Sequence, residues 1–182
     1  MRWNTFARSA VFAALAGIGV IAWLVMAGPL LGVRRALAFY LVGLTAIYVA
    51  GLAPSLRRGL GACAVVAALG SCLVVTTRTL PELAFGLAVL LAIARTVFLY
   101  RLRPARAVAV EVAFVGGGLL FARFLAGPSL VSMMLAVWGF LLVQSFFFLV
   151  GGVCVRERAA PQRDAFDAAH ERASALLEGL PV

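Results

Sequence analysis

The chain has 182 residues, of which 64% are hydrophobic and 13% charged, and its mean hydropathy is +1.08. Its formal charge of +9 rests on arginine alone, because all sixteen basic residues are Arg, and they lie in twos and threes between long apolar runs. This composition excludes a water-soluble domain, and the arginine pattern is typical of membrane topology signals rather than of nucleic-acid binding.

Six apolar segments follow one another along the chain. A membrane-spanning helix needs about 20 mostly apolar residues. Charged or proline-marked breaks predict such helices at residues 10–31, 36–53, 59–77, 80–100, 105–126 and 129–155. We therefore expect an all-α, polytopic fold, in which residues 1–155 form a bundle of six transmembrane helices within the lipid bilayer. The short loops predict that sequential helices pack as antiparallel neighbours.

The arginines between the spans predict the orientation. With six spans, both termini and the second and fourth loops lie on one side, which carries nine arginines up to Arg158, whereas the other side carries four. Positive residues in short loops stay cytoplasmic. The absence of lysine, with abundant Ala, Gly, Val and Leu, suggests a GC-rich bacterial genome. We expect a multi-pass protein of the bacterial cytoplasmic (inner) membrane with both termini in the cytoplasm.

Small residues recur at four-residue spacing in several predicted spans. Such residues let helix backbones approach each other in lipid. They are Ala10 and Ala14, then Ala64 and Ala68, then Ala84, Ala88 and Ala92, and finally Ala109, Ala113 and Gly117. These faces favour close helix contacts, either within the bundle or with other membrane proteins.

Arg95 and Glu111 are ionisable residues inside the predicted spans. Their midpoint is position 103, in the turn between the fourth and fifth spans, so an antiparallel hairpin places both side chains at equal depth. Charges within a bilayer normally face the bundle interior and find partners. An ion pair that sets the hairpin register is one interpretation. A proton or substrate relay with Glu111 as the exchangeable group, and an Arg95 that extends alone to the headgroups, are the alternatives.

Four other features have local interpretations. Thr79 and Glu82 have the spacing of a capping box at a helix start. Gln144, in the sixth span, predicts an interhelical hydrogen bond. Tyr48 is interpreted as an interfacial anchor or a packing residue. The triple glycine at 116–118 favours close packing over a kink.

The residue types that the spans lack argue against catalysis. The single histidine, His170, lies in the tail, the chain has no lysine, and the spans contain no aspartate. Haem, copper and zinc sites, Ser–His and Ser–Lys nucleophiles, and paired-aspartate chemistry therefore lack their residues. We expect no catalytic residues, no metal and no cofactor.

The tail, residues 156–182, differs in composition from the spans. Asp164 can cap a helix at residues 165–178, which Gly179 would end. From Asp164 onward four acids face one arginine, so an anionic membrane surface would repel this amphipathic cytoplasmic helix. Its partner is then either the chain's own basic loops or a separate cytoplasmic protein. Its predicted binding stripe is apolar and consists of Phe166, Ala169, Ala173, Leu176, Leu177 and Leu180.

Two functions fit these features. The first is a non-catalytic membrane subunit or assembly factor, whose bundle packs against other membrane proteins and whose tail binds a cytoplasmic component. The second is a small transporter, or a substrate-binding transport subunit, for an apolar or small substrate. The low polar content disfavours a hydrophilic cargo, because such a site needs several convergent polar groups.

Overall fold

The computed structural model describes residues 5–53, 55–99 and 104–149. Within these ranges the chain is helical, without strands, and contains six helices long and apolar enough to cross a membrane. The helices are α1 (Phe6–Leu31), α2 (Val33–Leu52), α3 (Leu56–Thr76), α4 (Leu80–Leu99), α5 (Pro104–Leu125) and α6 (Leu130–Ser145), and a 3-10 turn, η1 (Phe146–Phe148), follows α6. The described ranges thus contain the predicted number of apolar helices.

Several helix ends differ from the predicted ones because side-chain caps decide where helices begin. The hydroxyl of Thr5 accepts from the Arg8 amide, so α1 begins four residues earlier than predicted. Ser55 caps α3 in the same way, whereas the sequence pattern placed this start at Gly59. A hydroxyl cap satisfies amides that a helix terminus otherwise leaves unpaired. The predicted sixth span is α-helical only to Ser145, and its residues 150–155 lie outside the described ranges.

The turn between α1 and α2 consists of Gly32 alone, where residues 32–35 were expected. Gly32 has a φ of +77°, which side-chain-bearing residues rarely adopt, and its amide donates to the Gly28 carbonyl at 2.9 Å. Arg34, the second residue of α2, donates to the backbone carbonyls of Thr77, at 3.4 Å, and Arg78. Arg34 thereby ties the α1–α2 turn to the α3–α4 turn.

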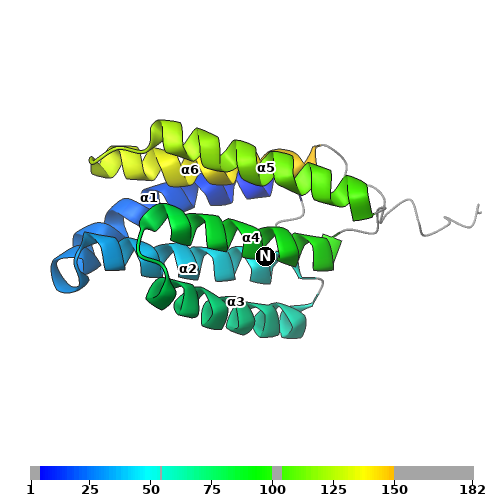
Figure 1. Ribbon diagram of the computed structural model, residues 1–182, viewed down its shortest axis with the longest axis horizontal. Helices are drawn as coiled ribbons and strands as arrows, with labels where there is room; N and C mark the ends of the chain where they lie inside the picture. The colour runs from blue at the N-terminus through cyan, green and yellow to red at the C-terminus, as the bar shows by residue number, and fades with distance from the viewer. Residues whose placement is uncertain (1–4, 54, 100–103, 150–182) are drawn as a thin grey trace, which may run out of the picture. The chain divides into compact units, whose positions relative to one another are not determined.

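The helices contact their sequence neighbours, and α1 also packs against α6 and α2 against α4. Figure 1 shows α5 and α6 side by side, with α2, α3 and α4 on the other side of the bundle and α1 behind. The α1–α2, α3–α4 and α5–α6 turns lie at one end, named here the α5–α6 end. At the opposite end, the α4–α5 end, α4 and α2 finish and α5 and α3 begin.

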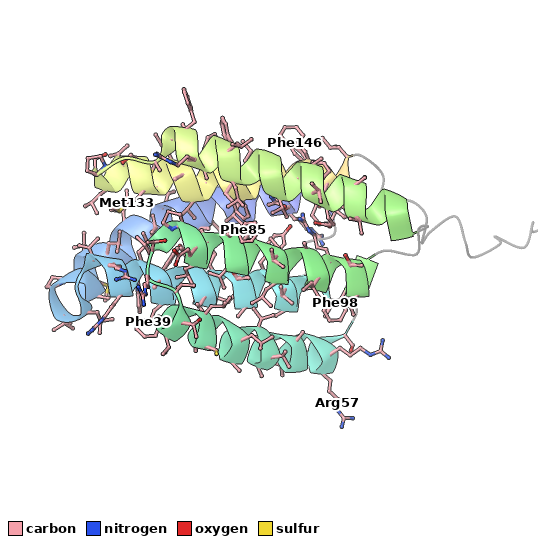
Figure 2. The ribbon with its side chains drawn as sticks, viewed as in Figure 1. Phe39, Arg57, Phe85, Phe98, Met133 and Phe146 are labelled. Atoms are coloured by element: carbon pink, nitrogen blue, oxygen red, sulfur yellow. The ribbon has the colours of Figure 1, made fainter. Side chains whose placement is uncertain are left out.

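Large apolar side chains cover the outside of the bundle. Phe39, Phe85 and Phe146 are exposed to 46%, 59% and 44%, and Figure 2 shows them around the helices, with Arg57 pointing away at the start of α3. In water such a surface would be unfavourable, whereas lipid tails solvate it. Both the apolar outer surface and the six helices long enough to cross a membrane are typical of a multi-pass membrane protein.

The small-residue faces divide into two groups. On α4, Ala88 is buried and its neighbours Ala84 and Ala92 are half-buried. The small residues of α3 and α5 are exposed instead, and they are Ala64 and Ala68 on α3 and Ala109, Ala113 and Gly117 on α5. The α4 face therefore packs within the bundle, whereas the α3 and α5 faces point outward.

The predicted tail helix at 165–178, with its stripe from Phe166 to Leu180, lies outside the described residues.

Candidate functional site

Arg95 and Glu111 meet inside the bundle, near the α4–α5 end. The Arg95 Nη2 donates to Glu111 Oε2 at 2.7 Å, and the two side chains are 0% and 7% exposed. α4 and α5 are antiparallel neighbours, so equal sequence distance from their turn places both residues at the same depth, as expected. Arg95 therefore does not extend alone toward the headgroups.

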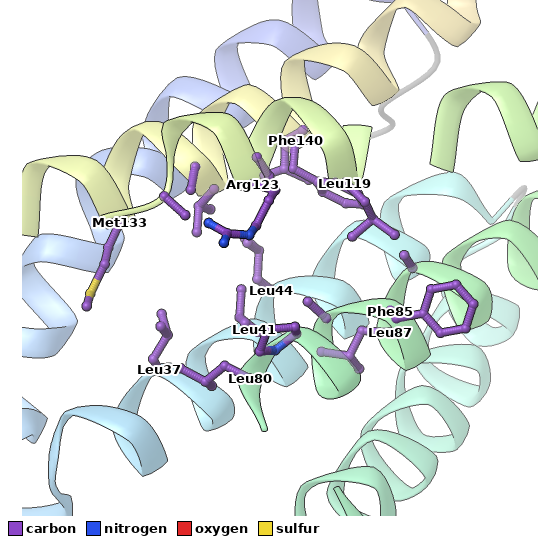
Figure 3. A pocket seen from close by; sticks show the side chains of 18 of the residues that line it. Leu37, Leu41, Leu44, Leu80, Phe85, Leu87, Leu119, Arg123, Met133 and Phe140 are labelled. Atoms are coloured by element: carbon purple, nitrogen blue, oxygen red, sulfur yellow. The ribbon is translucent and has the colours of Figure 1, made fainter. Parts of the chain in front are cut away.

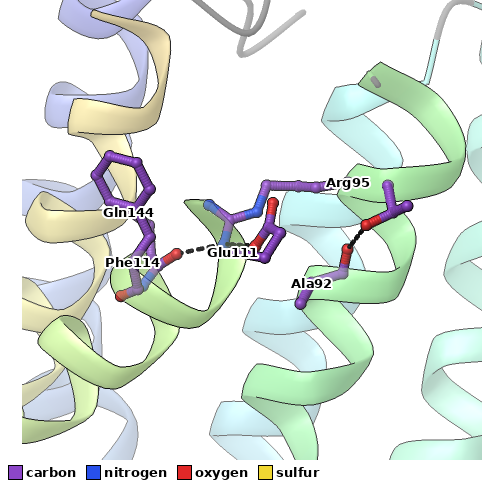
Figure 4. Close-up of polar contacts among 6 residues, drawn as sticks. Ala92, Arg95, Glu111, Phe114 and Gln144 are labelled. Carbon is purple, nitrogen blue, oxygen red and sulfur yellow. Dashed lines mark hydrogen bonds and ion pairs between the residues drawn. The ribbon is translucent and has the colours of Figure 1, made fainter. Parts of the chain in front are cut away.

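Gln144 of α6 is the third member of this group, which we name the Arg95 network. Its Oε1 accepts from Arg95 Nη2 at 2.5 Å, and its Nε2 donates to the Phe114 carbonyl of α5 at 2.8 Å. Figure 4 shows Arg95 reaching from α4 toward both Glu111 and Gln144. The interhelical hydrogen bond predicted for Gln144 is present, and the Arg95 network links α4, α5 and α6.

The Arg95 guanidinium is nevertheless costly to bury. Its centre lies 5.2 Å from the ring centroid of Phe147, a distance typical of cation–π attraction. Its Nε and Nη1 are buried and have no hydrogen-bond partner among the described residues. Replacing a buried ion pair with apolar residues of similar volume is often neutral or stabilising. The Arg95 network is thus better explained by helix register or function than by stability.

A second polar group, the Ser9 cluster, lies at the same end of the bundle. Ser9 of α1 lies within hydrogen-bond distance of the Tyr48 hydroxyl of α2, at 3.5 Å, and of the Ser145 hydroxyl of α6, at 2.9 Å. All three residues are at most 1% exposed. Because Ser145 follows Gln144 directly, the Ser9 cluster and the Arg95 network adjoin on α6. Together they contain at least one polar side chain from each of the six helices except α3.

One glycine lets α5 and α6 approach the Arg95 network. A Cβ on Gly118 would lie 2.6 Å from the Gln144 Nε2 and 3.0 Å from the Phe140 ring, whereas Gly116 and Gly117 have open space. α5 continues through the triple glycine as one α-helix. Close packing, the interpretation favoured from the sequence, therefore holds for Gly118 and not for the other two.

An apolar pocket of about 570 Å³ lies between α2 and α4 on one side and α5 and α6 on the other. Its lining runs along α4 from Leu80 to Leu91 and along α6 from Met133 to Leu141, and α2 adds Leu37, Leu41, Leu44, Thr45 and Tyr48. α4 and α5 contact each other less than most neighbouring helices do, and the ion pair joins them near the α4–α5 end. The pocket occupies the space between them toward the α5–α6 end.

The Arg95 network and the Ser9 cluster lie next to the inner end of the pocket, which is the end toward the α4–α5 end of the bundle. The cation Arg123 lies at its outer end, toward the α5–α6 end. Tyr48 both lines the pocket and belongs to the Ser9 cluster, and Leu91 and Leu141 lie one turn or less from Arg95 and Gln144. Arg123, in the last turn of α5, also lines the pocket. Figure 3 shows its side chain extending from α5 into the space that Leu41, Leu44 and Met133 border. The pocket is thus apolar along its length and cationic near the α5–α6 end.

Other predicted features are local. Glu82 accepts from the Arg78 and Thr79 amides at 2.9 and 3.3 Å, and its own amide donates to the Thr79 hydroxyl, so the capping box is present. Cys63 and Cys72 are free thiols. Among the described residues, no three His, Cys, Asp or Glu side chains lie close enough together to hold a metal ion.

The Ser9 cluster and the pocket were not predicted from the sequence. Tyr48 is buried, which supports its interpretation as a packing residue rather than an interfacial anchor. The Ser9 cluster could have been predicted from the polar residues in the first and last turns of the apolar helices, such as Ser9 and Ser145.

No protein-family model, no curated protein and no solved structure matches this chain.

Proposed function

We propose that this chain is a non-catalytic multi-pass membrane protein that binds a small apolar or amphiphilic molecule inside its bundle, as a small transporter or as the substrate-binding subunit of one. The observation that carries the proposal is the apolar pocket of about 570 Å³ between α2, α4, α5 and α6. Ligand sites are typically concave spaces of about 300–1,000 Å³ with a mostly apolar lining and a few placed polar groups. Thr45, Tyr48 and Arg123 are such polar groups.

The bilayer supplies the expected route to the pocket. Hydrophobic molecules concentrate among lipid tails, and the separation of α4 from α5 toward the α5–α6 end offers lateral access from them. The α4–α5 end is assigned to the cytoplasm of a bacterial inner membrane, because the side that contains it carries nine arginines up to Arg158 against four on the other side. Under this assignment the pocket opens in the outer half of the bilayer.

A second function, that of a subunit or assembly factor in a membrane complex, is favoured by the outward small-residue face of α5. Ala109, Ala113 and Gly117 are exposed. In membrane proteins small residues are enriched where another helix packs closely, so this face suits contact with a helix of another protein. This function is compatible with ligand binding, since a substrate-binding subunit also contacts other membrane proteins. Purification in a mild detergent, followed by mass spectrometry, tests it through the membrane proteins that co-purify and are lost when Gly117 is replaced by Leu.

Saturable photolabelling tests the proposed binding. The full chain is reconstituted in phosphatidylcholine vesicles with a neutral long-chain alkyl diazirine, and labelled peptides are mapped by mass spectrometry. We expect saturable labelling of the pocket-lining parts of α4 and α6, above unsaturable labelling of the outer surface. Replacing Ala84, which lines the pocket, with Phe should reduce the saturable labelling about tenfold or more.

The matched control is Ala68→Phe, which adds the same side chain to the exposed face of α3 and should leave the labelling unchanged. Equal labelling of the Ala84→Phe and Ala68→Phe variants would exclude the pocket as the binding site. Labelling that never saturates in the unmodified protein would contradict ligand binding altogether.

A further inference from the structure

The geometry points to a single-chain anionic amphiphile as the ligand of this pocket, with its acyl chain along α4 and its acidic headgroup paired with Arg123. This inference rests on the proposed function, that the pocket binds a ligand. It adds the chemical class of that ligand and its direction in the bundle.

The charge of Arg123 has no counter-ion among the described residues. The described ranges contain two acidic residues, Glu82 and Glu111, because the other five lie between positions 157 and 178. Glu82 is engaged by the Arg78 and Thr79 amides, and Glu111 by Arg95. Glu82 forms no ion pair with Arg123, and Glu111 lies twelve residues before Arg123 on α5, about 18 Å away by helical rise. Among the described residues, therefore, no acid compensates the exposed Arg123 side chain at the pocket, and an anionic group is complementary to it.

The position of Arg123 also indicates where the headgroup lies. Arg123 is in the last turn of α5, at the end of a span, where lipid headgroups are expected if the bundle crosses a bilayer. The remainder of the pocket is mostly apolar, with Thr45 and Tyr48 as its other polar residues, and runs toward the middle of the bundle. A ligand with its acid at Arg123 and its chain along α4 therefore has the orientation of a lipid in one leaflet, and it can enter between α4 and α5 without inverting.

The length of the pocket matches one fatty chain. Its lining on α4 extends from Leu80 to Leu91, a separation of eleven positions, which corresponds to about 16 Å of helical rise. An extended chain advances about 3.5 Å per three single bonds. The pocket thus accommodates about 14 carbon atoms in one extended chain, and Tyr48 and Leu91 close its inner end.

Competition between two chain-matched compounds tests the headgroup assignment. Tetradecanoate and tetradecanol are added separately to the photolabelling reaction at mildly alkaline pH, at which the acid is ionised. We expect the acid to compete about tenfold or more better than the alcohol, because a charge-assisted hydrogen bond to Arg123 forms with the carboxylate alone. Arg123→Gln should remove this preference, and Arg123→Lys should keep most of it.

Arg35→Gln is the matched control, since Arg35 lies at the same end of the bundle and is exposed like Arg123, but does not line the pocket. It should keep the preference for the acid. Circular dichroism of all variants checks that the helices are intact, and the Arg123→Lys variant provides a test even where Arg123→Gln fails to assemble.

Three outcomes would overturn the inference. Equal competition by acid and alcohol, or an equal effect of Arg35→Gln and Arg123→Gln, would reject Arg123 as the headgroup partner while saturable labelling still supports a pocket ligand. A two-chain phosphatidylglycerol that competes as well as tetradecanoate would reject the single-chain assignment. A failure of the proposed function is distinguishable from these, because labelling would then not saturate before any competitor is added.

Discussion

Replacing Glu111 with Gln should destabilise the bundle through the charge that remains on Arg95. The guanidinium is 0% exposed, and Glu111 is the acid that neutralises it, at 2.7 Å. The amide of Gln is nearly the same size as the carboxyl group and keeps one acceptor oxygen. The substitution therefore changes the charge of the Arg95 network while it leaves the packing almost unaltered.

The size of the effect follows from the burial of both partners. Removing one partner of a buried ion pair costs about 3–5 kcal/mol, because the other charge stays desolvated and uncompensated. We expect about 3 kcal/mol for Glu111→Gln, since the Gln oxygen can still accept from Arg95. Replacing both Arg95 and Glu111 with Met should cost less than either single Met substitution, because no charge remains buried.

Equilibrium unfolding in mixed micelles measures these differences. SDS is titrated against the purified protein in a neutral detergent, and the fluorescence of its tryptophans reports the loss of tertiary packing. Glu82→Gln is the matched control, because Glu82 is exposed and Gln also serves in a capping box, so its midpoint should stay nearly unchanged. Equal midpoints for Glu111→Gln and Glu82→Gln, or a double Met variant whose loss equals the sum of the single losses, would show that the buried Arg95 charge does not destabilise the bundle.

The remaining predictions concern glycines and use the same unfolding assay. Gly116→Ala, in open space, should stabilise the bundle by up to about 1 kcal/mol through helix propensity, whereas Gly118→Ala should be less stable because its Cβ displaces the Gln144 amide. Gly32→Ala should cost about 1–3 kcal/mol through its φ of +77°, and its control, Gly43→Ala, has open space and ordinary helical backbone. An unchanged Gly32→Ala variant, or a Gly118→Ala variant as stable as Gly116→Ala, would contradict the geometry described for each site.

The same Glu111→Gln variant separates the two interpretations that remain for the Arg95 network. If the network sets the register of α4, α5 and α6, the variant should lose stability and ligand binding together. If Glu111 is instead the exchangeable group of a relay, the variant should still assemble, with the lower stability expected from the buried Arg95 charge, and still show saturable labelling. It would then lose only a transport step driven by a proton gradient, measured by flux of tetradecanoate across the vesicle membrane.

Much of the architecture was predictable because it depends only on the spacing of residues along the chain. The number of apolar helices follows from the length and spacing of the apolar runs, and the capping box of Thr79 and Glu82 follows from their local spacing. The depth of Arg95 and Glu111 follows from their equal distance to one turn. The start of α3 was missed because Ser55 and its capping bond extend the helix beyond the apolar segment.

The apolar helices, their antiparallel order and the equal depth of Arg95 and Glu111 follow from the sequence alone. The packing of the helices was needed to show that Arg95 and Glu111 pair, that Gln144 joins them from α6, that Ser9, Tyr48 and Ser145 meet, and that Arg123 borders an apolar pocket. The physical reason is the nearly uniform hydrophobicity of these helices around their axes. A soluble helix marks its buried face with an apolar stripe, whereas a helix surrounded by lipid has apolar residues on every side. Which face turns inward, and which helices separate to leave a pocket, therefore depends on how all the side chains pack together.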